Sequence, residues 1–385
     1  MRKKDTRMPW KEKTVMDSRE EFVEAAKANQ KSFSALCRDY GISRKTGYKW
    51  LNRASLGQQL CDQSRCPNRQ PSKTAPEVEQ QILALRESNP VWGGKTIKAV
   101  LESAGVVGVP SSRTCDNILK RNGCIDPLAS LQHRPYQRFE RDHCNELWQT
   151  DFKGDFLLQD GTRCFPLDIL DDHSRFALRV EPKSAASGVK ESFIQTFCEF
   201  GLPNAILSDN GSQFSGFRGG YTQFERFLMD LDVLPIHGRI MHPQTQGKIE
   251  RFHRTMKYEA LREPIADMKE AKKVLQTWRW KYNELRPHSA LGMKTPASIY
   301  SPSFRNYFTP KSYVYDEGAV LRKVNNWGYL RFGPVRVFLS ETMADTLLEI
   351  REGGNDTFLV FYRNFQIAVI DAHTQKLVNR VIKKL

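Results

Sequence analysis

Residues 147–156 read LWQTDFKGDF, and this stretch decides the fold because its apolar and polar side chains alternate. Trp148 and Phe152 share one face of a predicted strand, whereas Asp151 and Lys153 share the other. The carboxylate of Asp151 therefore lies on the polar face of a strand whose apolar face packs on a core. We expect a sheet that begins at residue 147.

Further along the chain, strands alternate with helices. Val189, Phe193 and Phe197 recur every four residues, and Gly201 is expected to end the helix that they form. After the first strand, the sequence predicts strands at residues 165–169 and 176–180 joined by a turn at 171–175, a helix at 185–200, a strand at 205–208, a helix at 224–231, a strand at 234–237, a loop at 238–247 and a long helix. Three strands, helix, strand, helix, strand, helix is the order of an RNase H-like α/β domain.

Three acids fall where this fold can bring them together. Asp151 is on the first strand, and Asp209 directly follows the strand at 205–208, at the kind of strand end where open sheets form their sites. Glu250 belongs to the predicted helix at 246–257, beside the stripe that buries its apolar residues. Glu250 shares its own stripe with His253, Arg254 and Lys257.

Three converging carboxylates repel one another, and a hard divalent cation such as Mg²⁺ relieves the repulsion. Two such ions, roughly 3.5–4 Å apart, activate an attacking oxygen and stabilise the leaving oxygen of an in-line displacement at phosphorus. The pattern therefore indicates an enzyme that cuts or joins phosphodiesters.

The chain is strongly basic, and the excess charge is concentrated near its start. Its 59 Lys and Arg exceed its 44 Asp and Glu by 15, and residues 1–140 hold 25 basic against 15 acidic residues, or +10. Charge of this kind raises affinity for phosphate backbones, so nucleic acid is the expected partner. The sequence has no apolar run near the 18 or so residues that a membrane span needs, and its start does not read as a secretory signal. Eight scattered cysteines favour a reducing cytoplasm.

Residues 17–53 have the pattern of three short helices. Asp17 or Ser18 is expected to cap the first helix and Ser32 the second, and Gly41 separates them from a basic third helix. Helix, glycine-containing turn and basic helix is the arrangement that places a recognition helix in a major groove. The expected DNA contacts are Arg44, Lys45 and Lys49. The alternative is a plain three-helix bundle with a solvated basic face.

A second module of the same kind is predicted by helices at 76–87, 94–104 and 111–122, with residues 106–110 as strand or loop. Its last helix carries Arg113 and Lys120 as expected DNA contacts, against the alternative of a packing role. The predicted domains are a helix-turn-helix at 1–56, a linker at 57–75, a second helix-turn-helix at 76–124, a linker at 125–146, the α/β catalytic core at 147–300 and a C-terminal β domain at 301–385.

The C-terminal domain is expected to be a small β-barrel or sandwich. Short alternating runs follow residue 313, separated by turns such as Asn325-Asn326 and Gly333-Pro334. This domain would contact DNA or a second subunit. Elsewhere, Cys61 and Cys66 lack a second Cys or His pair, so structural zinc is not expected.

Five segments together resemble the catalytic core of insertion-sequence transposases related to retroviral integrases. They are LWQTDFKGDF (147–156), DILDDHSRF (168–176), LSDNGSQF (207–214), HPQTQGKIERFHRTMK (242–257) and YNELRPHSALGMKTP (282–296). The resemblance covers most of residues 33–300 and implies a DDE enzyme whose metal-binding triad is Asp151, Asp209 and Glu250. Enzymes of that family free a 3′ hydroxyl at each element end and use it to attack target DNA by one-step transesterification.

The resemblance implies two Mg²⁺ ions, replaceable by Mn²⁺, and double-stranded DNA as partner, both the terminal inverted repeats of the element and the target. Recombining two ends needs two sites held together, so at least a dimer is expected on DNA, in a bacterial cytoplasm close to the nucleoid. Along the helix of Glu250, phosphate contacts are expected from Lys248, Arg251, Arg254 and Lys257. The alternatives are a catalytically silent DNA-binding regulator and a hydrolytic nuclease of the same fold.

One departure from that family is the spacing of 40 residues between Asp209 and Glu250 (250 − 209 − 1), which is longer than usual. The glycine-rich stretch 215–221 is expected to loop out and leave the triad intact.

Other residues near the triad have secondary expectations. Asp171 and Asp172 are expected to make the hairpin turn, and Asp168 to lie near the site. His253 would contact phosphate, assist proton movement or pack on the helix surface. The expected roles of the remaining residues are orientation of Asp209 by Asn210, contact with the DNA end by Gln244 and Gln246, and packing on the core by Arg286, Pro287 and His288.

Overall fold

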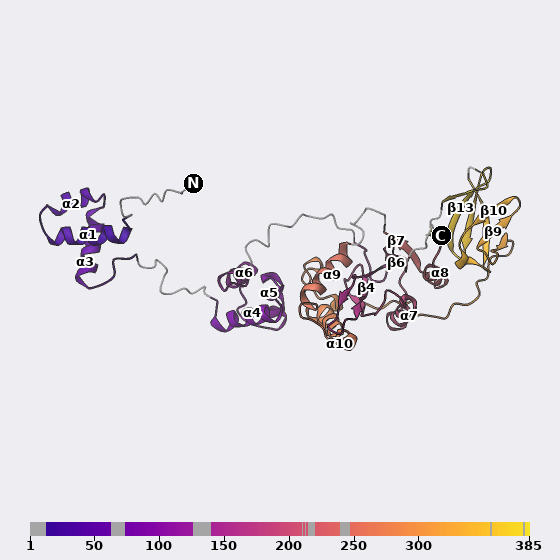
Figure 1. Ribbon diagram of the computed structural model, residues 1–385, viewed down its shortest axis with the longest axis horizontal. Coiled ribbons are helices and arrows are strands. Elements are labelled where there is room, and N and C mark those ends of the chain that lie inside the picture. The colour runs from indigo at the N-terminus through magenta and orange to yellow at the C-terminus, as the bar shows by residue number, and fades with distance from the viewer. Residues whose placement is uncertain are drawn as a thin grey trace, which may run out of the picture. The chain divides into compact units, whose positions relative to one another are not determined.

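The computed structural model describes residues 13–62, 74–125, 140–209, 211, 213–214, 220–238, 247–354, 356–379 and 382–385. The chain divides into two compact units, residues 1–73 and residues 74–385. Figure 1 shows both units and labels many of their helices and strands. The stretches 57–75 and 125–146, predicted as linkers, fall largely outside the described residues.

The first unit is a bundle of three helices, as predicted. They are α1 (Val15–Lys27), α2 (Phe33–Asp39) and α3 (Arg44–Ser55). Phe22, Leu36 and Trp50 pack at its centre. Ser32 caps α2 as expected, and Gly41 precedes α3 with a positive φ of 63° that favours glycine.

The predicted cap of α1 is wrong. Thr14 is the N-cap, and Asp17 is the third residue of a capping box in which each side chain accepts from the other's backbone N–H. The helix therefore starts before Asp17, because Asp17 is the partner of the cap and not the cap itself.

The second unit begins with three more helices, close to the predicted limits. They are α4 (Pro76–Ser88), α5 (Gly94–Ser103) and α6 (Ser112–Arg121), and the segment 106–110 is loop. Gly94 allows α5 to approach α6, since a Cβ there would lie 2.4 Å from the carbonyl oxygen of Ser112. Ile82, Ile97 and Leu119 form part of the buried core.

The centre of the second unit is a five-stranded mixed sheet in the order β5-β4-β1-β6-β7. Its strands are β1 (Leu147–Phe152), β4 (Leu167–Asp171), β5 (Ala177–Glu181), β6 (Ala205–Ser208) and β7 (Leu234–His237). The β5-β4-β1 part is antiparallel, and β6 and β7 run parallel to β1. The predicted order of strands and helices is confirmed. A small hairpin, β2 (Phe156–Leu157) and β3 (Arg163–Cys164), was not predicted.

Helices cover both faces of this sheet. These helices are α7 (Val189–Phe200), α8 (Gln223–Asp230), α9 (Gly247–Glu259) and α10 (Met268–Trp280). Phe193 of α7 and Phe227 of α8 pack with Trp148 on one face. Phe252 of α9 and Trp278 of α10 pack with Leu170 on the other. Along β1, successive side chains point to opposite faces of the sheet. Asp151 therefore lies on the face opposite Trp148, which is the face that α9 covers. Helix α7 starts four residues later than expected, after Gly188 with φ of +67°.

The C-terminal region is a β domain, in agreement with the predicted class. Strands β9 (Tyr329–Phe332) and β10 (Val335–Phe338) form one sheet. The second sheet contains β8 (Leu321–Lys323), β11 (Leu347–Gly353), β12 (Thr357–Tyr362), β13 (Phe365–Asp371), β14 (Leu377–Asn379) and β15 (Lys383–Lys384). Leu330 and Val337 from the first sheet pack with Leu348 and Val360 from the second. The domain is thus two sheets around one core.

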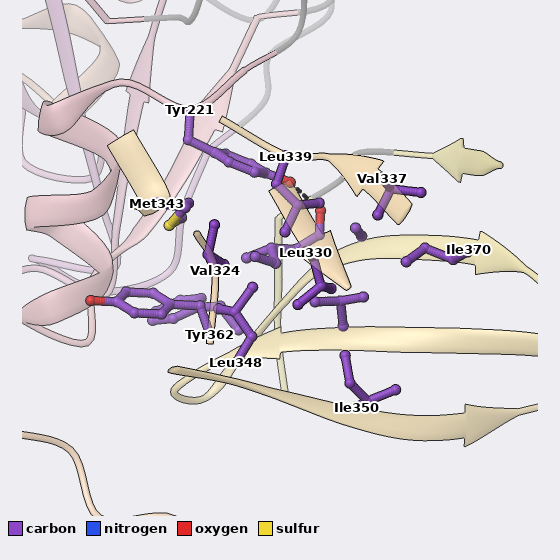
Figure 2. Close-up of a cluster of buried hydrophobic side chains, with 14 of the residues drawn as sticks. Tyr221, Val324, Leu330, Val337, Leu339, Met343, Leu348, Ile350, Tyr362 and Ile370 are labelled. Atoms are coloured by element: carbon purple, nitrogen blue, oxygen red, sulfur yellow. Dashed lines mark hydrogen bonds between the residues drawn. The ribbon is translucent and has the colours of Figure 1, made fainter. Parts of the chain in front are cut away.

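That core also receives residues from the α/β domain, as Figure 2 shows for Tyr221. Tyr221 is buried among the β-domain side chains and donates its hydroxyl to the carbonyl of Ile367. Met229 of α8 is fully buried in the same cluster. The expectation that residues 215–221 loop out is corrected at Tyr221; residues 215–219 lie outside the described residues.

Among the described residues, no helix is both long enough and apolar enough to cross a membrane.

Candidate active site

Asp151 and Asp168 lie opposite each other in the antiparallel pair of β1 and β4. Directly opposed residues project on the same face of a sheet. Both carboxylates therefore point toward α9, as the alternation of LWQTDF predicted for Asp151. Asp168 is fully buried, whereas the Asp151 side chain is 20% exposed.

Asp209 joins Asp151 at the same end of the sheet. The parallel register of β1 and β6 pairs Gln149 with Leu207, and two further residues along each strand lead to Asp151 and Asp209. The backbone N–H of Gly211 donates to Asp209 Oδ1 at 3.0 Å, which holds this carboxylate in a tight turn. The structure thus brings two of the three expected acids together.

The electrostatics of Asp151 reflect this crowding. Burial is the largest influence on its carboxyl, and together with the negative charges of Asp209 and Asp168 it raises the pKa from 3.8 to about 6, against an opposing effect of His253. Burial also raises the pKa of the Asp168 carboxyl. Carboxylates that repel one another in a partly dry site are the donor set that a hard divalent cation satisfies.

His253 connects α9 to both acids. Its Nε2 lies 2.9 Å from Asp168 Oδ2, and its Nδ1 lies 3.9 Å from Asp151 Oδ2. The shorter approach does not meet the geometry of a hydrogen bond. Because Nε2 is buried against Asp168, the packing role for His253 fits the structure better than a phosphate contact.

Glu250 is in the first turn of α9 and is exposed. It lies one helical turn before His253, on the stripe that borders Asp151. Within the part of the chain that the structure describes, no three His, Cys, Asp or Glu side chains form a group that could hold a metal ion. Glu250 is therefore not assembled with Asp151 and Asp209 in this structure, and its metal role remains a proposal.

The hairpin after β4 is built by its own acids, as predicted. Asp171 accepts hydrogen bonds from the backbone N–H and hydroxyl of Ser174, and Asp172 accepts from the side chain of Gln149. Lys248 Nζ lies 2.5 Å from Asp172 Oδ2 and is largely buried. The structure therefore gives Lys248 an internal ion pair instead of the exposed position that a phosphate contact requires.

The other expected phosphate contacts on α9 are exposed. Arg251, Arg254 and Lys257 lie on its solvent side. Lys153, two residues beyond Asp151 on β1, was not singled out from the sequence; burial lowers the pKa of its ammonium, whereas the charge of Asp168 opposes that shift and Lys257 adds to it. Its signal was the polar side of the alternation that identified Asp151.

The helical modules present their basic residues to solvent. Arg44 and Lys45 of α3 are exposed, and so are Arg113 and Lys120 of α6. Lys49 is also exposed but lies 3.4 Å from Asp62 Oδ1 and stacks over Trp50. Both modules therefore offer cations on the helix that the sequence predicted.

The segment after α10 packs on the core, as expected. Arg286 Nε lies 3.0 Å from Glu259 Oε1, and His288 packs edge-on against Tyr282. Burial lowers the pKa of the His288 imidazole to about 3, and the charge of Arg286 adds to the effect. Asn210, Gln244, Gln246 and Cys66 lie outside the described residues.

Models of known protein families match two regions of the chain. Families described as Integrase core domain match residues 141–243 and 231–296, and a family described as Homeodomain-like domain matches residues 46–119.

Three relatives each match part of this chain. The chain is 29% identical to an uncharacterized 39.2 kDa protein of insertion element IS476 from Xanthomonas euvesicatoria, over 40% of this chain and 44% of the relative. It is 30% identical to a putative integrase, ORF3, of Spiroplasma virus SpV1-C74, over 34% and 40%. It is 28% identical to an uncharacterized 31.7 kDa protein of insertion element IS407 from Burkholderia multivorans, over 40% and 55%. The chain thus spans about half, or less, of the length of these relatives.

Among solved structures, the HTLV-2 integrase catalytic core domain in complex with magnesium is similar over 42% of this chain and 99% of its own, with 17% identity and a TM-score of 0.31. At that TM-score the likeness adds nothing to the fold described above.

Proposed function

We propose that the chain is an insertion-sequence transposase of the retroviral integrase superfamily, which binds the ends of an insertion element and joins them to target DNA. The matches to integrase-core and homeodomain-like families and to proteins of insertion elements support this proposal. The observation that carries the proposal is the position of Asp151 and Asp209 at one end of the sheet, where burial, and then the negative charge of Asp209, raises the pKa of Asp151. Two neighbouring carboxylates of this kind suit metal-assisted phosphodiester chemistry.

Divalent cations are part of this proposal. The donor set fits Mg²⁺ or Mn²⁺ because it consists of carboxylate oxygens that repel one another without a cation. Asp151, Asp209 and Glu250 would hold the ions, with Glu250 reaching in from the first turn of α9. When bound, the cations activate the attacking oxygen and stabilise charge on the leaving oxygen.

The chain's own residues supply orientation and phosphate binding. The turn at Gly211 fixes Asp209, and the sheet fixes Asp151. Arg251, Arg254 and Lys257 on the exposed side of α9 would contact phosphates without reading sequence. The exposed cations of α3 and α6 would bind the element ends, and two copies of the chain would be needed to hold two ends together.

The test is a joining assay with labelled duplexes taken from the DNA that flanks the gene. The wild-type chain with Mg²⁺ should bind an end, free a 3′ hydroxyl and form a joined product. D151N, D209N and E250Q should each retain end binding and lose joining. Joining by D209N would refute the triad.

The same assay separates the rival functions. A hydrolytic nuclease would leave cut ends that never join target DNA. A catalytically silent regulator would bind ends without any metal-dependent cleavage.

A further inference from the structure

A buried acid on the sheet lies against one histidine of α9. Asp168 is fully buried. Among the described residues, neither of its carboxylate oxygens accepts a hydrogen bond. Its one ion pair in that part of the chain is the approach of His253 Nε2 at 2.9 Å. Burying a carboxylate with so few donors is costly, so its retention requires an explanation.

His253 belongs to α9, whose packing on the sheet is otherwise mainly apolar. Phe252 and Met256 pack against Leu170 and Ala177. Apolar packing of this kind holds a helix against a sheet but defines its rotation and its position along the axis only loosely. A buried polar contact adds that definition, which is the best-supported use of such pairs.

Two buried carboxylates contact α9 on either side of Glu250. Lys248, two residues before Glu250, lies 2.5 Å from Asp172 Oδ2. His253, three residues after it, lies 2.9 Å from Asp168 Oδ2 and 3.9 Å from Asp151 Oδ2. The first two turns of the helix are therefore attached to β4 and the hairpin that follows it. Since Glu250 and His253 share a stripe, the imidazole fixes the direction in which Glu250 projects.

We propose that Asp168 and His253 are a positioning pair that sets α9 so that Glu250 can complete the divalent-cation site with Asp151 and Asp209. This inference rests on the proposed function, because it gives the pair a purpose only if those three acids bind cations. In this proposal both members act through Glu250, as positioning residues.

The experiment measures Mn²⁺ affinity by titration calorimetry, without DNA, for D168N, H253Q and the double variant. Loss of a residue that orients a metal ligand typically lowers metal affinity by about 10- to 100-fold. We expect each single variant to bind Mn²⁺ at least about tenfold more weakly, and the double variant to bind no more weakly than the weaker single variant. Hydrogen exchange of residues 247–254 in EDTA should be faster in both single variants, because α9 loses an attachment.

The matched control is D171N. Asp171 is as buried as Asp168 and lies on the same strand, but it is bonded to Ser174 and Asn145 in the hairpin. D171N should keep wild-type Mn²⁺ affinity even where it lowers overall stability. If D168N fails to fold, as judged by lost hydrogen-exchange protection of peptides from β1 and β4, H253Q alone decides the question.

Wild-type Mn²⁺ affinity in H253Q, or losses in the two single variants that add in the double variant, would overturn the pair. Failure of the proposed function would look different. In that case D151N itself would bind Mn²⁺ like the wild type, whatever the behaviour of Asp168 and His253.

Discussion

Replacing Asp151 by Asn should make the metal-free protein more stable while abolishing its activity. The carboxyl of Asp151 has its pKa raised from 3.8 to about 6, chiefly by burial and then, against His253, by the charges of Asp209 and Asp168. A folded state that holds a proton more tightly than the unfolded state is destabilised as the pH rises through that interval. Asn has the same shape and carries no charge.

The magnitude follows from the shift. A difference of 6 − 3.8, or 2.2 pH units, corresponds to about 3 kcal/mol at pH values above 6. The sign is that of a raised folded-state pKa: the penalty is absent well below pH 3.8, grows between pH 3.8 and 6, and is complete above pH 6. D151N should therefore be more stable than the wild type by about 3 kcal/mol at pH 8 and by about half as much at pH 5.

The assay is hydrogen exchange of peptides from β1 and β4 in EDTA, at both pH values, which reports the free energy of unfolding of the sheet. E250Q is the control, because Glu250 is exposed and its replacement should change stability by less than about 0.5 kcal/mol. The reasoning fails if D151N is no more stable than the wild type at pH 8. Saturating Mg²⁺ should reverse the order, because only the wild type gains binding free energy.

Three further predictions concern other features. Mn²⁺ affinity of the wild type should fall about 11-fold between pH 8 and pH 5, because a proton on Asp151 with a pKa of about 6 competes with the metal; calorimetric titration at the two pH values would show no change if the carboxyl titrated normally. G94A should destabilise the second helical module by about 2–3 kcal/mol, since its Cβ would meet the Ser112 carbonyl at 2.4 Å, whereas the Cβ of G93A would meet only Asp116 Oδ1, at an ordinary contact distance of 4.0 Å, and should cost about 1 kcal/mol or less; hydrogen exchange of α5 and α6 compares them, and equal rates would contradict the packing argument. K45M should weaken end binding and reduce the slope of log affinity against log salt by about 1, measured by fluorescence anisotropy, and an unchanged slope would exclude a phosphate contact.

The strands were predictable because the sequence itself shows either alternating apolar and polar side chains, as in β1, or a short apolar run, as in β6. The limits of β6 and β7 agree with the predicted residues 205–208 and 234–237, and the signal at β6 is the short apolar run Ala205-Ile206-Leu207 between polar residues. Helix ends were harder to predict, because they depend on local side-chain bonds that periodicity does not register. At α1, Thr14 and Asp17 cap each other, and either could be taken for the first residue.

The candidate site was predictable where it follows strand alternation and hidden where it depends on tertiary contact. Asp151 and Asp209 follow from strand faces and strand ends. The buried ion pair of Lys248 and Asp172 joins residues 76 apart, and nothing in either neighbourhood indicates it. Asp168 did leave a signal, since it is a charge between apolar Leu167 and Ile169 inside a strand. Such a charge requires a partner, but the sequence does not say that the partner is His253.

The burial of Tyr221 in the β domain has a practical consequence for dissecting the protein. A fragment ending near residue 300 would lack the strands that surround Tyr221 and Met229, and it would also leave Asp230 without Tyr362 and Arg363. Apolar surface would then be exposed to solvent beside the segment that connects Tyr221 to Asp209. That exposure would favour self-association and would loosen the turn that holds Asp209. An inactive fragment of that kind would say little about catalysis, because its boundary cuts through a shared interior.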